Sequence, residues 1–544
     1  MARLIPLLLA LAAALVVFAV FPNGLIPLND AFGYVRSIAL TVEHGRPWTD
    51  GWLEPWSAGF SGLGALVFTA TGSMYLATYG VCAGLMGVAA WACFQLLAAR
   101  DVSGPLACAV TVILLFFPTV LWKFLEINGF SLYFTCLLLA LLGYERKNWL
   151  GFTLAWCVAL STRQSAVAWG VLPAYATVNA LLKRSPVGSA VVLRPMIATL
   201  VATGFFLCMT KFMNKTHAQN VITDQLLTRW SVQGSVRPLP VTLLTMGVAV
   251  GLGSIVLGSR RHGETARWRR ALAGSIAIVL LIAGLGWDLR FKTDFDHSAF
   301  QVPVFYGYLK CLCFLGGVGV ALGVRSVRPD FLLAALGCTS LLMLRQGSWD
   351  YYLADVAVFG FFAAPGAARG SEKSRLLPYV CTTLAVMSLS FVVFFKMRYD
   401  REYIVDTLGA RALQRGAIDW GDASFLPFGA MGWYYFPYYS THEGKTSANL
   451  AGFDRYLRRD VYGVAFRFPR LLRTFAAFRG TLPDDRTTVI EQERFSYCWF
   501  FRVDAALVRL PTSFNRTAAS PWPSHAVPPI LPLTDADWRE QLKR

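Results

Sequence analysis

The sequence predicts a mainly α-helical, polytopic membrane bundle of about 13 spans, followed by a C-terminal α/β domain on the outer side. The chain has 544 residues, of which 55% are hydrophobic and only 15% are charged. Soluble globular proteins carry about 25% charged residues. Apolar segments of spanning length recur up to about residue 396, and the composition then becomes mixed and polar. These three observations together indicate a membrane domain with one extramembrane domain.

The apolar segments are each roughly 17–25 residues long or slightly shorter, which is the length that a membrane-spanning helix needs. They lie at about 4–22, 75–98, 104–122, 128–144, 149–162, 165–182, 190–212, 239–258, 271–288, 304–323, 331–345, 352–365 and 376–395. The pair at 149–162 and 165–182 is interrupted by polar residues at 161–164, so we interpret it as a broken pair of short spans. The Gly-rich segment 57–72 is interpreted as a re-entrant or interfacial piece.

The distribution of charge predicts the orientation. With a cytoplasmic N-terminus, the inner loops up to residue 396 hold 17 Lys and Arg against 5 acids, whereas the outer segments hold 13 against 11. This asymmetry is typical of membrane proteins whose basic loops stay inside. An odd number of spans then places the C-terminus outside. We therefore predict a transmembrane domain over 1–396, including an outer loop at 23–74, and an exoplasmic domain over 397–544.

Several classes of function are excluded by what the sequence lacks. The net charge of +18 comes from scattered basic residues rather than a continuous patch, which argues against nucleic-acid binding. Ten of the 11 cysteines lie in apolar segments and no C-x-x-C pair occurs, so neither a zinc site nor a disulfide framework is indicated. Nucleophile-elbow and P-loop patterns are also absent.

Asp30 is the first candidate for chemistry. It lies between the first span and a stretch in which Phe32, Val35 and Ile38 recur at helical spacing. A carboxylate at this outer position could accept a proton from a hydroxyl or amine nucleophile. Asp is equally a favoured N-cap, so the residue could simply start the helix. The other acids of this loop, which include Glu54, are more often just solvated.

Glu126 lies in a very short outer turn between two predicted spans and must therefore be close to the membrane surface. A functional role is one interpretation. The alternative is an ion pair with Lys123, three residues earlier on the same helix end.

Two arginines interrupt or end apolar runs on the outer side. Arg163 lies in the broken pair of spans, and Arg345 lies at a helix end before an aromatic cluster that includes Tyr352. An arginine so close to hydrocarbon is costly without a partner, and its guanidinium suits bidentate binding of phosphate. Structural salt bridges or snorkelling to the interface remain as alternatives. The aromatic residues beside Arg345 are typical of an interfacial belt.

A weaker metal pattern occurs in the outer loop at 288–297, where Asp294, Asp296 and His297 form a D-x-D-H run. One such run without further ligands is better explained by a solvated loop.

The arrangement of these residues resembles the GT-C superfamily of integral-membrane glycosyltransferases that use polyprenyl-phosphate sugars, such as lipid A aminoarabinose transferase and the protein O-mannosyltransferases. Asn29-Asp30 is similar to the acid of the family's first loop, and Glu126 with Asn128 to its second acid. Leu160-Ser161-Thr162-Arg163 resembles the Thr-Lys or Thr-Arg pair in the family's broken spans. The stretch from Arg345 to Tyr352 is similar to the basic and aromatic stretch that precedes a late span of the family. The family's Lys-Pro-Pro at the end of the first loop is replaced here by Leu53-Glu54-Pro55-Trp56-Ser57.

The resemblance implies an inverting glycosyltransferase that moves a sugar from a polyprenyl-phosphate donor to a lipid, glycan or protein acceptor. It implies Asp30 and Glu126 as catalytic residues, and Arg163, Arg345 and Lys123 as ligands of the lipid phosphate. Residues that contact the acceptor or sugar are expected among Glu54, Asn128 and Tyr352. No cofactor is required, although Glu126 could hold an optional divalent cation, because a lipid phosphate is already a good leaving group.

Two other classes of function stay open on the sequence alone. One is a transporter or flippase of a lipid-linked substrate, which is disfavoured because no paired half-sequences and no acid central to a span are evident. The other is a polymer ligase, or a non-catalytic scaffold, with a similar cavity. A bacterial inner membrane is the expected location.

Overall fold

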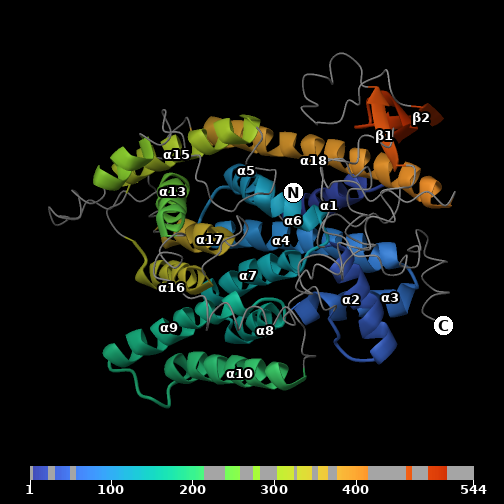
Figure 1. The fold of residues 1–544 in the computed structure, drawn as a ribbon. Coiled ribbons are helices and arrows are strands. Elements are labelled where there is room, and N and C mark those ends of the chain that lie inside the picture. The colour runs from blue at the N-terminus through green and yellow to red at the C-terminus, as the bar shows by residue number, and fades with distance from the viewer. Residues whose placement is uncertain are drawn as a thin grey trace.

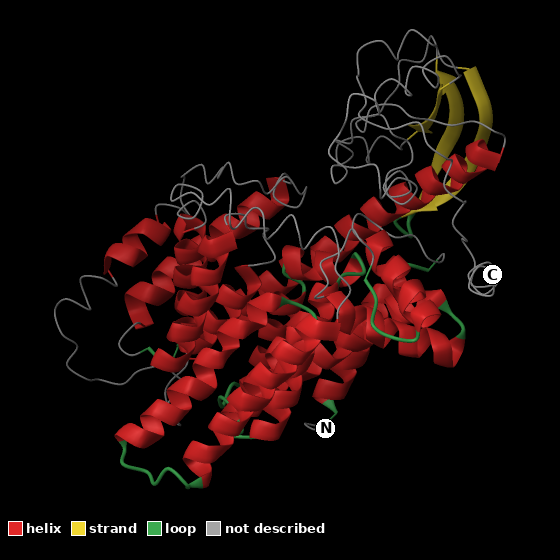
Figure 2. Cartoon of the chain, turned by 60° about the horizontal axis from the view of Figure 1, so that its bottom comes forward, coloured by secondary structure: helices red, strands yellow, loops and turns green. Residues whose placement is uncertain are grey.

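The computed structural model describes residues 4–22, 31–49, 57–212, 239–257, 274–281, 303–323, 327–345, 353–364, 377–414, 461–467 and 488–510. Over these ranges the chain is mainly helical, and its strands form one small sheet towards the C-terminus (Figure 1, Figure 2). The predicted mainly α architecture is confirmed.

The helices follow one another with short connections where the chain is described. In order they are α1 (Ile5–Val20), α2 (Ala31–His44), α3 (Ala58–Thr71), the π-helical turn η2 (Leu76–Gly80), α4 (Val81–Ala98), α5 (Gly104–Leu115), α6 (Pro118–Leu125), α7 (Gly129–Glu145), α8 (Trp149–Leu160), the 3₁₀ segment η3 (Gln164–Gly170), α9 (Val171–Leu182), α10 (Ala190–Phe212), α13 (Leu239–Leu257), a helical segment at 274–281, α15 (Pro303–Gly323), α16 (Pro329–Arg345), α17 (Leu353–Ala363) and α18 (Leu377–Gln414).

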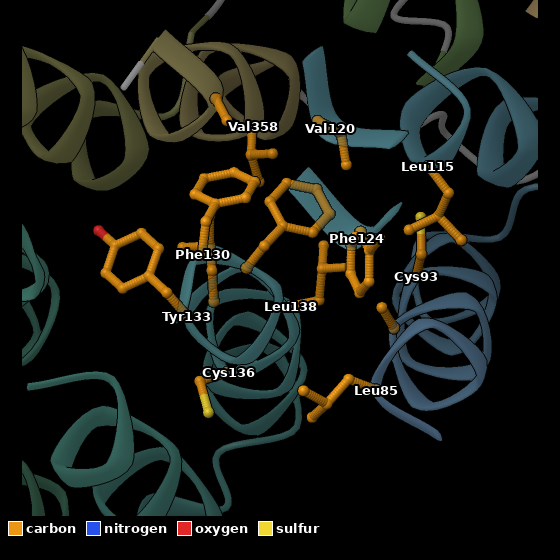
Figure 3. Packing of buried hydrophobic residues seen from close by; sticks show 14 of the residues in the cluster. Leu85, Cys93, Leu115, Val120, Phe124, Phe130, Tyr133, Cys136, Leu138 and Val358 are labelled. Carbon is orange, nitrogen blue, oxygen red and sulfur yellow. The ribbon is translucent and has the colours of Figure 1, made fainter. Parts of the chain in front are cut away.

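The core of the bundle forms around α4 and α7. Helix α1 lies against α4, α4 against α7 and α7 against α8. Figure 3 shows side chains from these helices meeting those of α6 and α17, among them Leu85, Phe124, Leu138 and Val358. Helices that are apolar all round are expected inside a bundle or in lipid. The inward faces of α4 and α7 are almost completely buried, whereas α9 and α10 expose many leucines and valines.

The predicted single span at 104–122 is wrong in detail, because the structure divides it into α5 and α6, which are bent by 67° relative to each other. Pro118 is the first residue of α6 and cannot donate a backbone hydrogen bond into the preceding turn. Phe117 before it is extended, with φ −56° and ψ 129°, as a residue before proline prefers. The short helix α6 therefore turns aside before α7 begins.

Membrane-spanning length is met by four described helices, at 76–98, 164–182, 190–209 and 381–401, and by a fifth if α5 and α6 count as one span. Eight further described helices are apolar but only 10–17 residues long. The chain is thus a multi-pass membrane protein, and the four long spans coincide with spans marked on the sequence. The total of about 13 stays a prediction.

The first predicted outer loop contains two helices. Helix α2 confirms the helical stretch expected after Asp30, and α3 occupies the segment interpreted as re-entrant or interfacial. The two helices pack closely at Gly64 of α3, which has no side chain. A Cβ added at Gly64 would lie only 2.5 Å from Ile38 Cδ1 of α2. The start of α3 is joined to the end of α8 by a hydrogen bond from Gly59 N to Ser161 O of 2.8 Å. This loop therefore lies directly on the break between α8 and η3.

The other end of α7 is held by a group of charges that we call the clasp: Arg100, Glu145, Arg328 and Asp330. Glu145 Oε1 accepts from Arg100 Nη2 at 2.8 Å and from Arg328 Nη1 at 2.6 Å. Arg328 also pairs with Asp330. All four residues were assigned to inner loops by charge counting, and the structure places them together, so these loops do share one end of the bundle.

Three antiparallel strands, β1 (Val461–Arg467), β2 (Thr488–Tyr497) and β3 (Phe501–Leu510), form a sheet in the order β1-β3-β2. The sheet packs on the C-terminal part of α18, where Ile404 and Leu408 meet Tyr497 and Val503. Burial raises the pKa of the Cys498 thiol at the end of β2 to about 11, so this cysteine is protonated and unreactive at neutral pH. Helix α18 passes without interruption through residue 397, the predicted domain boundary.

Candidate functional site

The break after α8 positions Arg163. Helix α8 ends at Leu160. The hydroxyls of Ser161 and Thr162 both donate to the carbonyl oxygen of Val158, at 2.7 and 2.9 Å. Such side-chain bonds to the helix's own carbonyls compete with continuation of the helix. Arg163 is then extended, with φ −156° and ψ 135°, and η3 begins. The predicted interruption at 161–164 is confirmed, but only α8 is short, because the helical segment at 164–182 has full spanning length.

The guanidinium of Arg163 lies over two aromatic rings of α7. Its Cζ is 5.7 Å from the ring centroid of Phe130 and 5.5 Å from that of Tyr133. Cation–π contacts of this kind hold a guanidinium in place at partial desolvation. The side chain is half-buried. A charge held at this depth is well suited to bind an anionic group at the edge of the bundle.

A carboxylate that sequence reasoning did not select lies beside Arg163. Asp355, in the first turn of α17, is only 4% exposed and accepts a hydrogen bond from Tyr133 Oη. Tyr133 in turn accepts from Ser165 Oγ at 3.0 Å. Arg163 is close enough to interact electrostatically with Asp355. The signal in the sequence was an acid in the apolar run 352–365, since an ionisable residue there marks a functional or structural site.

Two buried polar atoms around Tyr133 have no hydrogen-bond partner within the described structure. They are Asp355 Oδ1 and Trp169 Nε1, the latter on a ring whose centroid is 5.1 Å from that of Tyr133. Buried polar atoms are nearly always bonded to protein or to ordered water. The surroundings of Tyr133 are therefore suited to a water molecule or a polar ligand.

The turn between α6 and α7 carries three of the predicted residues. Lys123 and Glu126 form an ion pair, with Glu126 only 2% exposed, so the pairing considered as the alternative reading is present. Asn128 caps α7 through a bond from Phe130 N to its Oδ1 of 2.9 Å, and the same oxygen accepts from Tyr34 Oη at 3.4 Å. Tyr34 belongs to α2, so Asn128 links this turn to the first loop.

Gly129 shows how closely these pieces meet. A Cβ at Gly129 would lie 3.1 Å from Tyr34 Oη and 3.3 Å from Thr162 Cγ2. Helix α2, the start of α7 and the break after α8 thus converge on one point, which we call the break end of the bundle. It is opposite the clasp along α7.

The remaining predicted residues are only partly placed. Asp30, Glu54 and Tyr352 lie outside the described residues, although Asp30 directly precedes α2 and Tyr352 directly precedes α17. Arg345 is the last residue of α16, as expected of a helix-end arginine, and its side chain is not described. The D-x-D-H run at 294–297 is likewise outside the described ranges.

Replacing Tyr133 by Phe should lower the free energy of unfolding by about 1–3 kcal/mol, because Asp355 would lose its hydrogen-bond donor while staying buried. Tyr144→Phe is the matched control on the same helix. Tyr144 Oη also donates to a carboxylate, Asp330, at 3.0 Å, but Asp330 keeps Arg328 as a partner. Thermal unfolding in detergent should show the larger loss for Tyr133→Phe; equal losses would contradict this assignment.

Lys123→Met should lower the free energy of unfolding by about 3 kcal/mol, because it leaves Glu126 charged and buried without its partner. The double variant Lys123→Met with Glu126→Leu removes both charges and should recover most of the loss. Denaturation of the purified single and double variants tests this. A single variant as stable as the wild type would contradict a stabilising role for the ion pair.

Comparisons with known proteins give one structural match. No family model matches the sequence, and no curated protein matches it. The chain aligns with the crystal structure of ArnT from Cupriavidus metallidurans bound to undecaprenyl phosphate, at 13% sequence identity, over 94% of this chain and 98% of that chain, with a TM-score of 0.37.

Proposed function

We propose that this chain is a membrane glycosyltransferase that transfers a sugar from a polyprenyl phosphate to an acceptor, with inversion at the anomeric carbon. The observation that carries the proposal is the convergence at the break end. A half-buried arginine, held on Phe130 and Tyr133, lies at the interruption between α8 and η3 and next to the helices of the first loop. A lipid-linked phosphate can reach such a position laterally from the bilayer.

The proposed topology extends the described spans. The shorter apolar helices other than α3 would also cross the membrane, giving about 13 spans over 1–396, with the outer loop at 23–74, which contains α3, and an exoplasmic domain over 397–544. The clasp would then lie on the cytoplasmic side and the break end on the periplasmic side of a bacterial inner membrane. The joining of Arg100, Glu145 and Arg328 at one end supports this orientation, as does the excess of basic residues in the same loops.

In the proposed reaction the donor phosphate lies on Arg163, with Arg345 as the second cation. The acceptor oxygen or nitrogen forms a bond to the anomeric carbon while the bond from that carbon to the phosphate oxygen breaks, and the lipid phosphate leaves with the electron pair. Asp30 takes the acceptor's proton. The arginines stabilise the charge that develops on the phosphate and so lower the barrier.

The other predicted residues have more limited parts in this scheme. Lys123 is neutralised by Glu126 in the structure, so it can bind phosphate only if Glu126 is drawn to another partner, such as the acceptor or a divalent cation. Asn128 is bonded to Phe130 N and Tyr34 Oη and thus orients the first loop. Glu54 and Tyr352 remain proposed contacts to acceptor or sugar.

The test is reconstitution of the purified protein in liposomes with radiolabelled polyprenyl-phosphate sugars and candidate acceptors of lipid, glycan and protein type. Transfer of label together with release of polyprenyl phosphate in equal amounts is expected. Movement of labelled donor between leaflets without any transfer would instead support a flippase. Joining of preformed glycan chains, with a lipid pyrophosphate released, would support a polymer ligase.

A further inference from the structure

The turn between β2 and β3 presents two large apolar side chains outwards. The loop consists of Cys498, Trp499 and Phe500, because Tyr497 and Phe501 are the last paired residues. Cys498 and Trp499 both adopt left-handed conformations, with φ of 49° and 60°. Phe500 N donates to Cys498 O at 2.7 Å and closes the turn. Trp499 is 46% and Phe500 75% exposed.

This turn lies beside a membrane-spanning part of α18. Cys498 Sγ is 3.8 Å from Val393 O, and Cys498 N donates to Asp400 Oδ2 at 2.5 Å. Both partners belong to the candidate span Cys381–Arg401. At a rise of about 1.5 Å per residue, Val393 lies about 12 Å along the helix from the end of that span. The turn therefore lies alongside the last two turns of this candidate span.

The turn also lies on the side of α18 that faces away from the bundle. Phe395 and Arg398 contact Trp122 of α6, with ring centroids 5.0 Å apart and the Arg398 Cζ 4.2 Å from the indole centroid. Val393 and Asp400 are seven residues apart and therefore lie on one side of α18, and the helical spacing places Phe395 and Arg398 on another side. A side chain exposed on this outer side, at the depth of a span, faces lipid.

We propose that the β2–β3 turn inserts Trp499 and Phe500 into the leaflet on the sheet's side, with phospholipid as the partner. Tryptophan is favoured at the boundary between headgroups and acyl chains, where its ring is apolar and its N–H can bond to headgroups or water. Insertion would anchor the sheet against the bundle. The inference is independent of the proposed enzymatic function.

A second observation fits the same arrangement. Lys396 and Asp400 form a buried ion pair within the span, one turn apart. Such a pair is costly if it faces hydrocarbon alone. The turn covers it, because Cys498 N bonds to Asp400 and the Trp499 ring centroid lies 5.6 Å from Lys396 Nζ. The turn thus replaces lipid next to two charges and places its own aromatic rings in the lipid.

The experiment uses a photoreactive p-benzoylphenylalanine in place of Phe500 in the full-length protein, reconstituted in nanodiscs of phosphatidylcholine and phosphatidylglycerol that contain a tritiated phospholipid. Val489 is the matched control site. It is 55% exposed on the same strand β2, eight residues from Tyr497 and so about 26 Å from the turn. Irradiation should attach labelled lipid at position 500 at least five-fold more than at position 489.

Two outcomes would overturn the proposal. Equal lipid labelling at the two positions would mean that the turn is no closer to the bilayer than the far end of the sheet. Crosslinks from position 500 only to a second copy or to a copurified protein would identify a protein contact instead. Should the Phe500 variant fail to elute as a folded protein on size exclusion, the same substitution at Trp499 answers the question, because both side chains occupy the turn.

Discussion

Arg163→Ala should reduce kcat/KM for sugar transfer about 10²- to 10³-fold, which is the loss typical of removing one preorganised group that stabilises developing negative charge. The guanidinium is held over Phe130 and Tyr133, so little reorganisation is needed when a phosphate binds. Arg163→Lys should recover only part of the rate, since an ammonium retains the charge but not the bidentate geometry.

The matched control is Arg146→Ala, which removes the same charge from an exposed arginine at the opposite end of α7, where Arg146 bonds to Gln95. The Arg146→Ala variant should transfer sugar at initial rates close to those of the wild type. It should also bind free polyprenyl phosphate as the wild type does. If Arg163→Ala and Arg146→Ala lower the rate equally, the effect is one of general charge and Arg163 is not the phosphate ligand. Measuring KM and kcat separately shows whether binding or the chemical step is lost.

Asp30→Asn should lower kcat about 10²- to 10⁴-fold, the range for loss of a general base, with a smaller change in KM for the donor. The substitution keeps the size of the side chain and its ability to cap a helix, because Asn is as good an N-cap as Asp. It therefore separates the two interpretations of this residue. A helix cap predicts unchanged activity and unchanged stability, whereas a catalytic base predicts lost activity at unchanged stability.

Asp101→Asn serves as the control, since Asp101 is an exposed acid near the clasp, far along the bundle from the break end. Rates should be measured in liposomes at several pH values, with thermal unfolding of each variant in parallel. Undiminished transfer by Asp30→Asn would remove Asp30 as the base. Glu54→Gln should then be examined, because it is another acid of the first loop.

Local features of this chain could be predicted from the sequence because they depend on neighbouring residues alone. The break at Ser161 to Arg163 follows from polar residues that interrupt an apolar run, and the helix after Asp30 follows from apolar spacing. The pairing of Lys123 with Glu126, one of the two interpretations of that turn, is a contact within three residues. The bend at Pro118 was missed, although its cause is equally local, because hydrophobicity continues across it.

Contacts between helices needed the tertiary structure. Tyr133 and Asp355 are 222 residues apart in the chain, and Glu145 is joined to Arg328 across 183 residues. A helix in lipid is recognisable from its own sequence, because every backbone group is satisfied within it. The choice of its neighbours depends on close packing of small and polar side chains, which has no local signature. For the same reason, the sequence alone indicated Arg163 as a candidate ligand, but only the packing of α7, η3 and α17 placed Asp355 beside it.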